Sequence, residues 1–112
     1  MSQRGSFVTE YIYCEKCLEV AKKALLDNDK YLCSRQLPSW EGDGKLLPII
    51  SGKLGGLYIG EELSVIRDTL KESKERPCCS IKIVVLPESD GVWVIEWGPN
   101  KTRVQCVDGE EC

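Results

Sequence analysis

The sequence predicts a single α/β or α+β domain with a mixed sheet, two helices and an added C-terminal antiparallel meander. A length of 112 residues suits one domain, and 42% hydrophobic with 29% charged residues suits a folded chain. The predicted order is strand, helix, strand, strand, helix and three strands. The strand–helix–strand opening favours a parallel pair joined by a right-handed crossover. We expect one domain over residues 1–112, with the meander at 80–107 and a mobile tail at 108–112.

The first strand and first helix lie on either side of a cysteine pair. Residues 7–13 (FVTEYIY) are rich in β-branched and aromatic side chains, which is typical of a strand. Cys17, Ala21 and Ala24 then recur at helical spacing, and Asn28 follows the apolar stripe. The sequence therefore predicts a helix that begins at the cysteine pair and ends before Asn28.

The middle of the chain is predicted to hold two strands and a turn. Residues 31–37 form a short candidate strand that Pro38 ends. Residues 46–50 are apolar but contain Pro48, which cannot donate a hydrogen bond to a sheet. Pro48 is therefore expected at a strand start or a sheet edge. Gly55 and Gly56 are predicted to lie in a tight turn.

The last third predicts a helix and the meander. An apolar stripe at i, i+4, i+7 and i+11 indicates an amphipathic helix, and Pro77 ends it. Its members are Ile59, Leu63, Ile66 and Leu70. Strands are predicted at 80–86, 92–97 and 102–107, with an Asp-Gly pair at the first turn between them.

Composition excludes several classes of function. A net charge of −3 and a pI near 5.0 argue against a nucleic-acid-binding domain, which usually has a basic face. No apolar run reaches the roughly 20 residues of a membrane span. No histidine is present, which excludes Ser–His and Cys–His catalysis and histidine-ligated zinc. The N-terminus lacks an apolar leader, so we expect a cytoplasmic, reducing location.

Seven cysteines are unusual for this length, and two of them form a C-x-x-C pair at Cys14 and Cys17. A pair at a strand-to-helix junction lies beside the free N–H groups of the first helical turn, which stabilise a thiolate. Lys16 adds a positive charge nearby. We expect the pKa of Cys14 to fall below the free-thiol value of about 8.5.

Four segments together resemble the thioredoxin-like superfamily, and the glutaredoxins within it. They cover roughly residues 6–74 without the middle helix that is usual in that family. The segments are FVTEYIY-CEKC-LEVAKKALL, LPII at 47–50, GKLGG at 52–56 and EEL at 61–63.

The resemblance implies a small thiol–disulfide oxidoreductase. By analogy Cys14 is the attacking thiol and Cys17 the resolving thiol. Pro48 corresponds to a cis-proline that shapes the substrate groove, with Gly55 and Gly56 near a glutathione or partner site. Lys16 would assist substrate binding. Substrates would be protein or glutathione disulfides, with glutathione or a reductase as electron donor and neither a metal nor an organic cofactor.

An alternative from another class is a non-catalytic α+β binding or adaptor module with a cysteine-ligated structural zinc. Without histidine, four cysteines would have to supply the ligands. We take these as Cys14, Cys17, Cys33 and Cys78, because Cys79 is expected on the opposite face of a strand from Cys78. Under either hypothesis the missing middle helix would expose a sheet edge or face, which favours a homodimer or partner binding.

Overall fold

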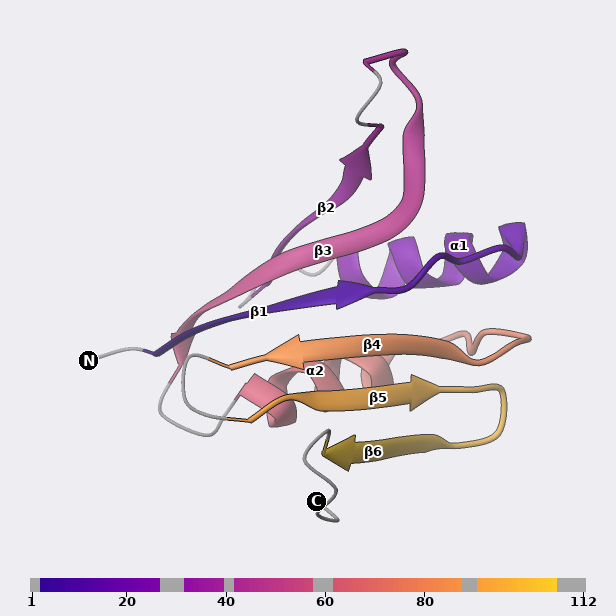
Figure 1. Cartoon of the computed structure of the whole chain (residues 1–112). Helices are drawn as coiled ribbons and strands as arrows, with labels where there is room; N and C mark the ends of the chain where they lie inside the picture. Colours follow the sequence, from indigo (N-terminus) through magenta and orange to yellow (C-terminus); the bar gives the residue numbers. More distant parts are fainter. Residues whose placement is uncertain (1–2, 27–31, 40–41, 58–61, 88–90, 107–112) are drawn as a thin grey trace.

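The main structural element is a six-stranded sheet in which every neighbouring pair is antiparallel (Figure 1). The computed structural model describes residues 3–26, 32–39, 42–57, 62–87 and 91–106. The strand order is β2-β3-β1-β4-β5-β6. The strands are β1 (Gln3–Thr9), β2 (Leu32–Pro38), β3 (Leu46–Leu57), β4 (Ile81–Leu86), β5 (Trp93–Trp97) and β6 (Thr102–Cys106). The α+β class is thus confirmed, whereas the predicted mixed sheet is wrong.

The parallel pair predicted for the opening is also wrong. β1 and β2 do run in the same direction, but β3 lies between them and pairs with both. The connection from β1 through the first helix therefore crosses two strand spacings, about 10 Å. With the second helix and β4, the first four strands follow the split β-α-β order. β5 and β6 extend this sheet as the predicted antiparallel meander.

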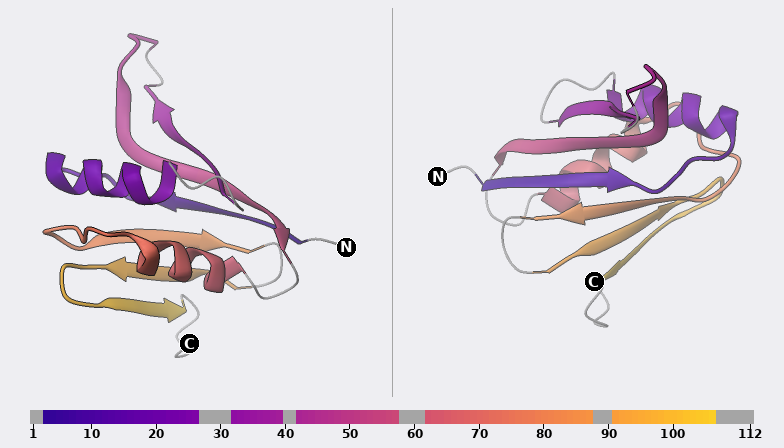
Figure 2. Two further views of the ribbon diagram at one scale, coloured as in Figure 1. Left: turned by 180° about the vertical axis from the view of Figure 1, so that it is seen from behind. Right: turned by 45° about the horizontal axis from the view of Figure 1, so that its top comes forward.

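The helices cover one face of the sheet (Figure 2). They are α1 (Glu15–Ala21), which continues as the π-helical turn η1 (Lys22–Leu26), and α2 (Glu62–Glu72). The core between helices and sheet contains Phe7 and Trp97 as its largest side chains, both almost fully buried. Its other members include Cys17, Ala21, Leu25, Ile50, Leu54, Ile66, Ile83, Val85 and Ile95. Among the described helices, none is long and apolar enough to cross a membrane.

Long strand β3 overturns two predictions about its residues. Gly55 and Gly56 lie within this strand and not in a turn. Pro48 is the third residue of β3, next to a register shift opposite Gln36 and Pro38, where a missing N–H donor is tolerated. No described residue has a cis peptide bond, so the cis-proline expected at Pro48 is wrong. The family-like glycine turn and proline loop are therefore both one continuous strand.

The sheet has two edges, formed by β2 and β6. β6 has mostly exposed side chains and pairs only with β5 among the described strands. Dimerisation through an edge strand stays a prediction. The predicted tail at 108–112 lies outside the described residues.

Candidate metal centre

One half of the site is built by the connection between β1 and α1. Past Thr9 the chain stays extended, and Ile12 anchors it with a buried side chain and an N–H that donates to the Pro48 carbonyl at 2.9 Å. The helix then begins with Cys14 as its N-cap residue, in an extended backbone conformation. Cys17 lies one turn further on and faces the core with 1% of its surface exposed. The C-x-x-C pair thus lies at the helix start, as predicted.

The other half is the segment between α2 and β4. Pro77 is fully buried, which fixes the chain as it returns to the sheet. Cys78 and Cys79 follow in a bend, and β4 begins only at Ile81. The side chains of adjacent residues alternate between faces only within a strand. Because these two cysteines precede the strand, both can turn toward the C-x-x-C pair, and the expectation of opposite faces was wrong.

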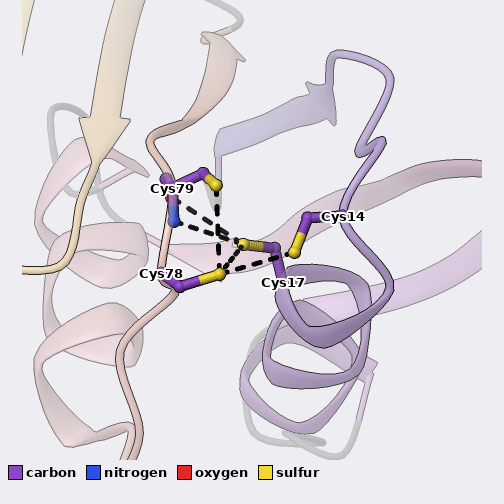
Figure 3. Close-up of side chains that lie close together, drawn as sticks. All are labelled: Cys14, Cys17, Cys78 and Cys79. Atoms are coloured by element: carbon purple, nitrogen blue, oxygen red, sulfur yellow. Dashed lines mark hydrogen bonds between the residues drawn. The ribbon is translucent and has the colours of Figure 1, made fainter.

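The four cysteine sulfurs form one compact group (Figure 3). The Cys78 sulfur is central, at 3.4 Å from the sulfurs of Cys14 and Cys17 and 3.9 Å from that of Cys79. All four sulfur atoms lie within 4.8 Å of one another. Cys17 and Cys78 are 61 positions apart in the sequence, so only the folded chain brings the two halves together.

This geometry is compatible with a single tetrahedral ion. A zinc–thiolate bond of about 2.3 Å places neighbouring sulfurs of a regular tetrahedron about 3.8 Å apart. The three Sγ–Sγ distances around Cys78 bracket that value, and the other three are at most 4.8 Å. Tetrahedral sites of four thiolates are typical of zinc or iron, and cysteine is the only ligand type this group offers.

Backbone contacts orient the innermost ligand. The Cys79 N–H donates to the Cys17 sulfur, with the nitrogen 3.3 Å away. An N–H that points at a sulfur restricts its position, as contacts around metal ligands commonly do. Together with the burial of Cys17, this hydrogen bond joins the two halves.

Mutual contact between the thiols shifts their pKa values in opposite directions. The pKa of Cys14 falls from 9.0 to about 7, mainly through the Cys17 backbone N–H and then through the Cys78 thiol. The pKa of Cys78 rises to about 12, chiefly because its hydrogen bond with Cys14 favours the protonated thiol. For Cys79, the hydrogen bond with Cys78 lowers the pKa, but Cys17, burial and the charge of Cys14 together outweigh it, and the net direction is upward. The pKa of Cys14 therefore shifts in the direction that its helix position predicts.

The structure separates the remaining predicted site residues from this group. Cys33 lies on edge strand β2, exposed and opposite Lys53, and does not belong to the four-cysteine group. Cys79 occupies the place that the sequence analysis gave to Cys33. Lys16 is exposed in the first turn of α1, while Pro48 does not line the pocket that contains the cysteines. The only signal for Cys79 was its position two residues after Pro77, outside the alternating pattern of β4.

Comparison with known proteins identifies no relative of this chain. No protein-family model, curated protein or solved structure matches it.

Proposed function

We propose that this chain is a non-catalytic binding module whose fold is held together by one Zn²⁺ ion. Its ligands are the thiolates of Cys14, Cys17, Cys78 and Cys79. The observation that carries the proposal is the convergence of these four sulfurs within 4.8 Å from two distant segments. A site with four protein ligands leaves no open position for substrate, which is typical of structural zinc.

The metal would connect two segments of the chain that few other contacts hold together. The β1–α1 connection and the segment before β4 both lie at the end of the central β1–β4 pair. Beyond the Glu10 N–H, which donates to the Lys82 carbonyl, no further backbone hydrogen bond between described residues links these two segments. A zinc ion there would replace the missing sheet pairing with four metal–sulfur bonds.

The test is the metal content of three proteins purified under reducing conditions without added metal. Wild type and Cys33→Ser are expected to contain one zinc per chain, and Cys79→Ser well under one. Co²⁺ substitution should give the absorption of a tetrahedral thiolate complex in the first two only. Cys33→Ser is the matched control, because the ligand set predicted from the sequence contains Cys33 in place of Cys79. Metal loss in Cys33→Ser, or no metal in wild type, would contradict the proposal.

Thiol–disulfide exchange is the second candidate, supported by the contact between the half-buried Cys14 thiol and neighbouring sulfurs. The Cys14 thiolate would attack glutathione disulfide, forming a mixed disulfide and releasing one glutathione thiolate. Cys17 would then attack Cys14, forming a protein disulfide and releasing the second glutathione. Cys78 could also resolve the intermediate, because its sulfur lies 3.4 Å from that of Cys14. The thioredoxin-like resemblance supports this candidate through the C-x-x-C alone, because Pro48, Gly55 and Gly56 lie within a strand.

Turnover measurements separate the two candidates. Metal-free protein that reduces glutathione disulfide catalytically, with a small dithiol as the electron donor that reduces the Cys14–Cys17 disulfide again, would favour the redox candidate if this turnover is lost in Cys14→Ser. The metal proposal expects zinc-loaded protein to show no turnover, since all four thiolates are coordinated. Mass spectrometry of a Cys17→Ser, Cys78→Ser double variant detects a trapped glutathione at Cys14 if exchange occurs.

A further inference from the structure

A pocket opens directly beside the four cysteines. It lies where the β1–α1 connection separates from the start of β4, and its volume is about 450 Å³. Its walls include Glu10, Tyr11, Tyr13 and Ile81, and the cysteines Cys14, Cys17 and Cys79 close one side. This size lies within the usual range for pockets that hold a small molecule or an anchoring side chain.

The charged groups that line this pocket are all negative in the zinc-loaded protein. Glu10 contributes a carboxylate, and four thiolates around one Zn²⁺ contribute two further net negative charges. Among the described residues, no lysine or arginine lines the pocket. Lys16 and Lys82, which adjoin lining residues in the sequence, are exposed and lie outside it. The pocket therefore favours a cation.

Two tyrosines give the pocket an aromatic wall. The rings of Tyr11 and Tyr13 are stacked, with centroids 5.8 Å apart and planes inclined by 21°. Tyr11 and Tyr13 are 45% and 89% exposed, so both are accessible to a ligand from solution. The negative face of an aromatic ring attracts cations, and a planar guanidinium can also stack on it.

We propose that this pocket binds an arginine side chain from a partner polypeptide. The inference rests on the proposed function, because the bound zinc supplies the charge of the thiolate cluster. The carboxylate of Glu10 pairs with the guanidinium, and the exposed tyrosine rings pack against its plane. The volume exceeds that of one guanidinium group, so the pocket also accommodates the aliphatic part of the side chain and adjoining backbone. A binding module with this pocket recognises an exposed basic segment.

The experiment is an NMR titration of the zinc-loaded full chain, with metal content measured on the same sample. The probes are acetyl-Gly-Arg-Gly-amide and the same peptide with citrulline, which keeps the shape but carries no charge. The arginine peptide should shift amide signals of residues 10–14 and 79–81 saturably. The citrulline peptide should bind at least about threefold more weakly. Methylguanidinium is a third probe that carries the cation without a peptide.

Variants connect the binding to named side chains. Glu10→Gln should lower the affinity for the arginine peptide by about two- to fivefold, as for the loss of an exposed ion pair, and leave the affinity for the citrulline peptide unchanged. Tyr13→Leu keeps an apolar side chain but removes the aromatic ring, and it should lower the affinity for the arginine peptide by a similar factor. Glu72→Gln at the end of α2 is the matched control, because it removes the same charge outside the pocket lining. It should have no effect.

Several outcomes would overturn the inference. A zinc-loaded sample that binds both peptides equally, or neither, contradicts the arginine pocket and leaves the metal proposal standing. Methylguanidinium that binds as tightly as the peptide shows that the ligand is a small organic cation and not a polypeptide. A sample without stoichiometric metal contradicts the metal proposal and, with it, this inference.

Discussion

Removal of the metal should lower the melting temperature by a predictable amount. Its ligands come from segments 61 residues apart, so the complete site does not exist in the unfolded chain. A ligand that binds only the folded state at a free concentration a thousand times its Kd stabilises that state by about 4.1 kcal/mol. For 112 residues the unfolding entropy is about 0.24 kcal/mol per kelvin. The expected difference in melting temperature between zinc-loaded and metal-free protein is therefore about 17 °C.

This shift is an upper value, because each half of the site retains two thiolates that bind some zinc in the unfolded state. The assay is thermal unfolding followed by circular dichroism under reducing conditions, with zinc buffered at a known free concentration and then removed by a chelator. Cys78→Ser lacks the central sulfur and should show no zinc-dependent shift. Cys33 is exposed and lies outside the four-cysteine group, so the Cys33→Ser variant should show the full zinc-dependent shift in melting temperature.

One result would refute the reasoning directly. If the chelator removes the metal completely and the melting temperature of wild type stays the same, the ion does not stabilise the fold. A shift of equal size in Cys78→Ser would likewise show that the stabilising metal binds elsewhere.

Three further predictions concern the protons of the site and the packing of the sheet. With the pKa of Cys14 at about 7, zinc binding should expel about 0.9 proton from this thiol at pH 6 and about 0.1 at pH 8. Calorimetry in buffers of different ionisation enthalpy measures the total release, and equal release at both pH values would contradict the lowered pKa. Gly52→Ala should lower the free energy of unfolding in urea by about 1–3 kcal/mol, because the added Cβ would lie 2.5 Å from the Phe7 ring. Unchanged stability would mean that the ring moves freely. Thr9→Val removes the hydroxyl that accepts a hydrogen bond from the Ile50 N–H at 2.9 Å and should lower the free energy of unfolding by about 1–3 kcal/mol. A variant as stable as wild type would show that this N–H finds another acceptor.

The order of elements could be predicted from the sequence because each element carries a local signal. The alternation in β4 and the apolar stripe of α2 both reflect one buried face, and the structure places both elements close to their predicted bounds. The partner of each strand has no such signal. Whether β2 or β3 lies beside β1 depends on which edge of the β2–β3 hairpin packs against β1, which is a property of the whole sheet.

Only the local part of the candidate site could be predicted from the sequence. Cys14 and Cys17 are near in sequence, and their spacing alone indicates shared chemistry. The choice between Cys33 and Cys79 as a further ligand depended on where β4 begins. A strand that already included residues 78 and 79 would send their side chains to opposite faces, whereas the observed start at Ile81 leaves both cysteines in the bend. The predicted ligand set was therefore wrong because it treated these two residues as part of a strand.

The separation of the two cysteine pairs along the chain also sets an order of events during synthesis. At about 5–20 residues per second, a ribosome adds the 61 residues that lead from Cys17 to Cys78 in roughly 3–12 s. During that interval the nascent chain contains only two of the four sulfurs of the cluster, and β1 lacks the neighbour that β4 later provides. The last partner of the central strand and the second cysteine pair then leave the ribosome together. The sulfur cluster is therefore completed at the same step that closes the middle of the sheet.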